Sequence, residues 1–216
     1  AESPDWWGDL VSDSGLTEDR YVQAVETKPM PISRPVVHHS GTSMIAPDGT
    51  GESLSEFAPG KYGDHYPEGS ARLIKAGSKI SFGVHLHSIG EERPAIIKVA
   101  YKFYPKGFVP KYRVSEVNVG STNGHLFDEL DIPANTVTRH DAYSRLPKAA
   151  RIISYQPHMH IRGKAMTMEA ILPNGQTQVL SHVADFNFNW HNSYVYKETA
   201  APLLPKGTII KVTAWH

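Results

Sequence analysis

Short stretches in which apolar and polar residues alternate dominate this chain. The clearest is Lys79–His87, which begins after a turn at residues 75–78. Alternate side chains of a strand project to opposite faces. One face carries Ile80, Phe82, Val84 and Leu86, and the other carries Ser81, Gly83, His85 and His87. This stretch is therefore predicted to be a strand with one apolar face and one face bearing histidines.

Similar runs, rich in Val, Ile, Thr, Tyr and Phe, recur along the chain between turn residues, which favours many short antiparallel strands. We expect further strands at residues 21–26, 36–39, 71–74, 96–104, 112–119, 149–160, 164–172, 178–180, 194–196 and 208–215. Asn174-Gly175 between two of these runs is a strong hairpin signal.

The remaining stretches carry weaker patterns. Residues 1–20 read as irregular, residues 46–70 as a long turn-rich excursion, and residues 120–131 as a polar loop. No helix of convincing length and period is found. The predicted fold is all-β, with two jelly-roll-like β-sandwich domains at residues 1–108 and 109–216 and a hinge near 106–110.

Composition narrows the function classes. The 216 residues contain 22 Lys+Arg against 22 Asp+Glu, so no basic surplus points to nucleic acid. No apolar run reaches the roughly 20 residues of a membrane helix, so no membrane insertion is expected. There are no cysteines, which excludes disulfides, thiolate metal sites and cysteine nucleophiles. Any metal must be held by His, Met, carboxylate or water.

Six of the 12 histidines lie in three short clusters. These are His38-His39, His85-Leu86-His87 and His158-Met159-His160. A His-x-His pair on a strand presents two imidazoles side by side. Adjacent residues on a regular strand point to opposite faces, so joint ligation by His38 and His39 requires a strand end, a bulge or different ring nitrogens. Three such clusters in one chain predict one or two metal sites.

The donor types restrict the metal. A set rich in imidazole and poor in carboxylate suits copper or zinc and argues against calcium, magnesium and non-haem iron. The sequence contains no His-Glu-x-x-His helix and no Gly-x-Ser-x-Gly elbow, which argues against a metalloprotease or a serine hydrolase. The histidines outside the clusters are interpreted mainly as exposed or hydrogen-bonded; these are His65, His125, His140 and His182, with His191 and His216 less clear.

The ordered set of motifs resembles the copper type II, ascorbate-dependent monooxygenases, which include peptidylglycine α-hydroxylating and dopamine β-monooxygenases. The resemblance rests on Val36–His39, Val84-His85 and Pro157–Lys164. A bacterial branch is closer, through Tyr66–Gly69, Asp131–Pro133, Asp185–Trp190 and Pro202–Thr208. The matching order covers roughly residues 16 to 216.

This resemblance implies two mononuclear copper sites, one in each jelly-roll domain, and insertion of one oxygen atom from O2 into a substrate C–H bond. His38, His39 and His85 match the electron-relaying copper, and His158 and His160 match the oxygen-binding, catalytic copper. His87 is a further candidate ligand or a residue that supports His85. The external one-electron donor would be ascorbate or a cytochrome.

Two departures from the family accompany the resemblance. The animal enzymes carry disulfides, whereas this chain must rely on core packing. The family's oxygen-binding copper also takes a methionine from a strand beyond the His-x-His pair, and no methionine follows Met168 here. Met159, Met166 and Met168 are predicted to be core residues. We therefore expect either that the chain is truncated or that the second site is altered, with His216 as the candidate substitute ligand.

The leading hypothesis is an exported copper monooxygenase, periplasmic or extracellular, acting on a small-molecule or peptide substrate. Tyr155 and Arg162 flank the His-x-His pair and are candidates for neighbouring contacts. The alternative is a non-catalytic copper-binding or electron-transfer subunit of a larger assembly. A structural sandwich with polar surface histidines is the third interpretation.

Overall fold

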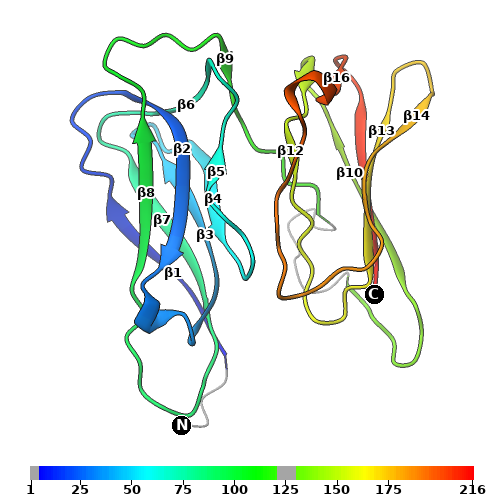
Figure 1. Cartoon of the computed structure of the whole chain (residues 1–216), viewed down its shortest axis with the longest axis horizontal. Helices are drawn as coiled ribbons and strands as arrows, with labels where there is room; N and C mark the ends of the chain where they lie inside the picture. Colours follow the sequence, from blue (N-terminus) through cyan, green and yellow to red (C-terminus); the bar gives the residue numbers. More distant parts are fainter. Residues whose placement is uncertain (1–4, 121–129) are drawn as a thin grey trace. The chain divides into compact units, whose positions relative to one another are not determined.

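The computed structural model describes residues 5–120 and 130–216, and its regular elements are almost all strands (Figure 1). In the described ranges the helical elements are two single-turn 3-10 helices, Pro31–Ser33 and Glu198–Ala200. The chain divides into two compact units, residues 1–116 and 117–216. The predicted all-β fold is confirmed.

Unit 1 contains two sheets. The first has the order β1 (Trp6–Asp13), β7 (Lys79–Leu86), β3 (Val37–Ile45), β4 (Gly51–Phe57). The second has the order β5 (Asp64–His65), β2 (Arg20–Pro29), β6 (Ser70–Ile74), β9 (Tyr112–Arg113). In this second sheet β8 (Ile97–Phe103) also pairs with β2, and Figure 1 shows the two side by side.

The two sheets of unit 1 enclose one apolar core. Its buried members come from strands of both sheets: Val22, Val25, Met44, Leu54, Ile74 and Ile80. Burial of such side chains is the main favourable term in folding, at about 1.5 to 3 kcal/mol for each large aliphatic group. Unit 1 is therefore a β-sandwich.

Unit 2 has a four-stranded antiparallel sheet with the order β10 (Arg139–Arg145), β17 (Ile209–Trp215), β13 (Ala165–Ile171), β14 (Thr177–Val183). Two short pairs complete it: β11 (Ala150–Arg151) with β16 (Leu203–Leu204), and β12 (Ser154–Tyr155) with β15 (Tyr194–Val195). The core packs the sheet against these pairs through Leu146, Tyr155, Met159, Met166, Met168, Ala170, Phe186, Leu204, Ile210 and Val212.

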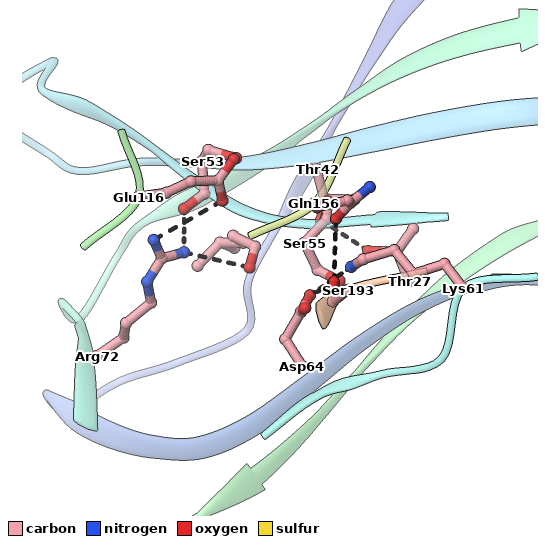
Figure 2. A network of polar contacts seen from close by, with 11 residues as sticks. Thr27, Thr42, Ser53, Ser55, Lys61, Asp64, Arg72, Glu116, Gln156 and Ser193 are labelled. Carbon is pink, nitrogen blue, oxygen red and sulfur yellow. Dashed lines mark hydrogen bonds and ion pairs between the residues drawn. The ribbon is translucent and has the colours of Figure 1, made fainter. Parts of the chain in front are cut away.

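A chain of buried polar contacts crosses the interior of unit 1 (Figure 2). Thr27 on β2 and Thr42 on β3 join their hydroxyls at 2.7 Å. Thr42 Oγ1 donates to the Ser55 carbonyl on β4 at 2.9 Å, so Thr27 is the donor to Thr42. Ser55 Oγ in turn donates to Asp64 on β5 at 2.8 Å. Because Thr27 and Asp64 belong to the second sheet whereas Thr42 and Ser55 belong to the first, these side-chain contacts link the two sheets directly.

Arg72 makes a second link between the sheets. This buried side chain projects from β6, and its guanidinium donates hydrogen bonds to the carbonyl groups of Ser53 and Leu54 on β4 (Figure 2). Its guanidinium also lies 3.9 Å from the Glu116 carboxylate and 5.9 Å from the Tyr66 ring centre. Buried polar groups need such partners, because leaving one unsatisfied costs about 1 to 3 kcal/mol.

Several sequence-based predictions differ from the structure. Residues 6–13, expected to be irregular, form β1, and the 46–70 excursion contains β4 and β5. Strand β10 was not predicted. In the predicted strand 112–119 only Tyr112–Arg113 is a strand. Part of the loop predicted at 120–131 lies outside the described residues, as does His125.

The division between the units falls after Glu116, beyond the predicted 108/109 boundary and the proposed hinge at 106–110. The physical reason is that β9 pairs in parallel with β6, Ser70 with Tyr112 and Ala71 with Arg113, and so holds this segment in unit 1. Over the described residues, none of the helices has the length and apolar character needed to cross a membrane.

Candidate metal centre

Three histidines of unit 1 converge on one face of its first sheet. His38 and His39 come from β3 and His85 from β7. Their ligand nitrogens all lie within 4.8 Å of one another. His38 Nδ1 and His85 Nδ1 are 2.8 Å apart. The structure thus brings together the three residues that the resemblance assigns to one site.

A β-bulge explains how two adjacent histidines reach the same site. Val37 pairs with Leu86 and His39 pairs with His85, so the register shifts by one residue at His38. A bulge places two residues of one strand opposite one residue of its partner and re-aims their side chains. A bulge is one of the distortions that we expect from the sequence if His38 and His39 are to bind one metal ion.

His85 is the most enclosed of the three. Its side chain is buried, and the Trp7 ring stacks on it with centroids 3.5 Å apart and an interplanar angle of 13°. Asp5 Oδ2 lies 2.9 Å from His85 Nε2, and Asp5 Oδ1 lies 2.8 Å from His87 Nδ1. These hydrogen bonds, from His85 first and then His87, lower the pKa of the Asp5 carboxyl.

The contact with Asp5 defines which nitrogen of His85 faces the cluster. A carboxylate only accepts hydrogen bonds, so His85 Nε2 carries the proton and donates to Asp5. In the neutral ring Nδ1 then has its lone pair, and it is Nδ1 that faces His38. His87 is exposed and outside the cluster; it touches Asp5 instead.

The donor set fits a copper or zinc ion. Two nitrogens bound to one ion at about 2.0 Å can be at most about 4 Å apart, and the His38–His85 spacing meets this limit. The cluster contains imidazoles only, and Glu56 Oε1 approaches His39 Nδ1 at 3.9 Å. Three imidazoles without a carboxylate suit copper or zinc and disfavour calcium and magnesium.

In unit 2, His158 and His160 do not lie on a strand as predicted. They occupy the segment between β12 and β13, before a turn in which Gly163 N donates to the His160 carbonyl at 2.9 Å. An alternation nevertheless persists, because Met159 is buried while His158 is half-buried and His160 is exposed. The two imidazole rings have centroids 5.4 Å apart.

Gly163 allows this segment to pack closely. A Cβ at this position would lie 2.7 Å from Met159 Cβ and 3.0 Å from Phe186 Cδ1. Contacts below 3.0 Å force a neighbour to shift, so only glycine fits without rearrangement. Met159 can therefore enter the core of unit 2 between the two histidines.

His191 is a residue of this region that sequence reasoning left unassigned. It is almost fully buried, and its Nε2 donates to the Met159 carbonyl at 2.8 Å. Its ring centroid lies 4.7 Å from that of His158. His191 therefore fixes the backbone between His158 and His160. The sequence feature that could have indicated a buried role for His191 is its position directly after the aromatic-rich segment Phe186–Trp190.

His216 lies at the end of β17 and faces His140, with their Nδ1 atoms 3.3 Å apart. Burial, and then the neighbouring His140, lower the pKa of His216. Among the described residues, no group of three ligand atoms within 4.8 Å includes either of them.

Other sequence assignments have clear positions. Met159, Met166 and Met168 are buried core residues, as predicted. Tyr155 is also buried in the core, and burial raises the pKa of its hydroxyl. Arg162 is exposed, as is His65, and His182 is exposed with Nδ1 2.7 Å from Thr167 Oγ1.

Comparison with known proteins adds no identification. No family model matches the chain, and no curated protein matches it. Among solved structures, a protein of Bacteroides ovatus ATCC 8483, provisionally described as an α-L-fucosidase, aligns at 9% identity and a TM-score of 0.27. The alignment covers 96% of this chain but 34% of that protein, so the chain spans about a third of its length. At that TM-score the likeness shows neither a shared fold nor a shared activity.

Proposed function

We propose that this chain is a copper-dependent monooxygenase that inserts one oxygen atom from O2 into a substrate C–H bond. In this proposal His38, His39 and His85 hold an electron-transfer copper, and His158 and His160 hold the oxygen-binding copper. The observation that carries the proposal is the convergence of His38, His39 and His85, produced by a bulge. We further propose that the enzyme is exported, that its substrate is a small molecule or a peptide, and that ascorbate or a cytochrome donates the electrons.

Copper supplies one-electron chemistry when bound, because it cycles between Cu(I) and Cu(II), whereas zinc has no redox chemistry. The chain's own residues hold the donors in place. In unit 1 the bulge aims His38 and His39, and Trp7 packs on His85. In unit 2 the burial of Met159 and the hydrogen bond from His191 orient the segment that carries His158 and His160.

A second candidate function is a copper carrier or electron-transfer subunit. It is favoured by the difference between the units: unit 1 supplies three clustered imidazoles, whereas the segment 158–160 of unit 2 supplies two. Such a protein would bind copper in unit 1 and lack oxygen chemistry.

Copper stoichiometry and electron paramagnetic resonance of the copper-loaded chain discriminate these functions. The monooxygenase predicts two type II copper signals that ascorbate removes by reduction, and the carrier predicts one. A copper-reconstituted sample without bound copper would reject both functions.

His38→Ala tests whether the two sites are separate. We expect this variant to lose one copper, because a ligand of unit 1 is gone, while the copper at His158 and His160 stays bound. His65→Ala, which changes an exposed histidine of the same unit, is the matched control and should retain both. Loss of both coppers in His38→Ala would contradict independent sites.

A further inference from the structure

We propose that Asp5 is a positioning residue for the unit 1 metal centre, holding His85 in the orientation and tautomer that present Nδ1 to the ion. This inference rests on the proposed function only in requiring copper at His38, His39 and His85. It assigns a role to the segment that begins at Asp5, a part of the chain to which the sequence patterns gave no role in metal binding.

Strand pairing places Asp5 beside His85. Within the β1–β7 pair Trp6 is opposite Leu86 and Trp7 is opposite His85. Asp5 lies directly before β1, two residues from Trp7, and its carboxylate contacts both His85 and His87. Edge strand β1 and the residue directly before it therefore bring an aromatic ring and a carboxylate to one imidazole.

Both oxygens of the carboxylate are used. Oδ2 accepts from His85 Nε2 at 2.9 Å, and Oδ1 accepts from His87 Nδ1 at 2.8 Å. The contact with His87 holds the carboxylate in the orientation in which it accepts the hydrogen bond from His85. Trp7, stacked at 3.5 Å, blocks rotation of the His85 ring away from Asp5.

A carboxylate that accepts from the far nitrogen of a ligating imidazole fixes its tautomer and makes it a stronger donor; loss of such partners typically weakens metal binding about 10- to 100-fold. A stronger donor also favours Cu(II) over Cu(I). Asp5 should therefore increase Cu(II) affinity and lower the reduction potential of this centre.

An ordinary surface ion pair would not have these effects. Asp5 is partly exposed, with 41% of its side-chain area accessible, and exposed ion pairs add little to stability. A merely structural role thus leaves the copper affinity, the potential and the spectrum unchanged.

The test uses the full chain carrying His158→Ala and His160→Ala, so that copper binds in unit 1 alone. Into this parent are placed Asp5→Asn, which keeps the shape but not the charge, and Asp5→Glu, the conservative variant. Asp13→Asn, at the far end of β1, is the matched control. Cu(II) affinity by competition titration, the reduction potential and the electron paramagnetic resonance spectrum are measured for each.

We expect Asp5→Asn to bind Cu(II) about 10- to 100-fold more weakly, with a higher reduction potential and altered spectrum. Asp5→Glu should recover much of the affinity, and Asp13→Asn should match the parent. If the parent binds copper and Asp5→Asn behaves like Asp13→Asn, the role of Asp5 is wrong while the copper site stands. A parent that binds no copper overturns both.

Discussion

Contacts made by single residues orient the histidines of this protein. Gly163 leaves room for Met159, and His191 binds the Met159 carbonyl, so the backbone between His158 and His160 is held from two sides. The histidine clusters and the core role of the methionines could be predicted from the sequence. The role of His191 could not, because it depends on a contact between residues 32 positions apart.

Gly163→Ala should destabilise unit 2 by about 1 to 3 kcal/mol, the usual cost of adding a methyl group to a packed site. The new Cβ would press on Met159 and shift His158 and His160, so copper binding by that pair should weaken as well. Chemical denaturation and copper titration measure the two effects.

Gly41→Ala provides the comparison, because a Cβ there would meet no atom within 4 Å. Equal stability and equal copper binding in the two glycine variants would contradict the packing argument.

At the scale of strands, the missed elements share a position. Strands β1, β4 and β10 are all edge strands of four-stranded sheets. An edge strand needs partners on one side only, and β1 and β10 are largely exposed, so their sequences lack a clean apolar alternation. Strand β14 is also an edge strand, but it follows the Asn174-Gly175 turn and was found through that signal.

The bulge in β3 also shows what could not be predicted from the sequence. The sequence indicates that His38 and His39 need a distortion to share a site, and the neighbouring Pro35 and Ser40-Gly41 make one plausible. Its type depends on the register between β3 and β7, which is a long-range pairing. The sequence therefore indicates the candidate ligands, but their convergence depends on how the strands pair in the sheet.

The hydroxyl chain between the sheets gives a prediction at this scale. Thr42→Val should lower the free energy of unfolding by about 1 to 3 kcal/mol, because it removes the hydroxyl that bonds to the Ser55 carbonyl and takes from the buried Thr27 hydroxyl its acceptor. Thr27→Val should cost less, about 0.5 to 1.5 kcal/mol, since Thr42 can still donate to Ser55.

Urea denaturation of both variants measures this order, with the exposed strand residue Thr177→Val as the control. A larger effect of Thr27→Val than of Thr42→Val would show that the direction of the hydrogen bonds is assigned wrongly.

For the whole molecule, buried tyrosines predict a loss of stability in alkali. Burial raises the pKa of Tyr66 from 10.0 to about 12, and it also raises the pKa values of Tyr101 and Tyr155. The unfolded chain releases the Tyr66 proton near pH 10 and the folded chain only near pH 12. The unfolded state is therefore favoured increasingly as the pH rises through this window.

We expect Tyr66 alone to account for a fall of roughly 2 to 3 kcal/mol in the free energy of unfolding between pH 10 and 12. Denaturation curves at several pH values measure the slope, which should be shallower in Tyr66→Phe. Tyr62→Phe, at an exposed tyrosine, should keep the original slope. A Tyr66→Phe slope equal to that of the unaltered chain would refute the assignment.

The polar links between the sheets of unit 1 have one more consequence. They consist of hydroxyl, carboxylate, guanidinium and carbonyl groups, and the chain contains no cysteine. None of these groups can be reduced or reshuffled by thiols, unlike the disulfides that commonly staple small exported domains. The links between the two sheets of unit 1 are therefore the same in oxidising and in reducing surroundings, which is compatible with the proposed function of binding a redox-active copper.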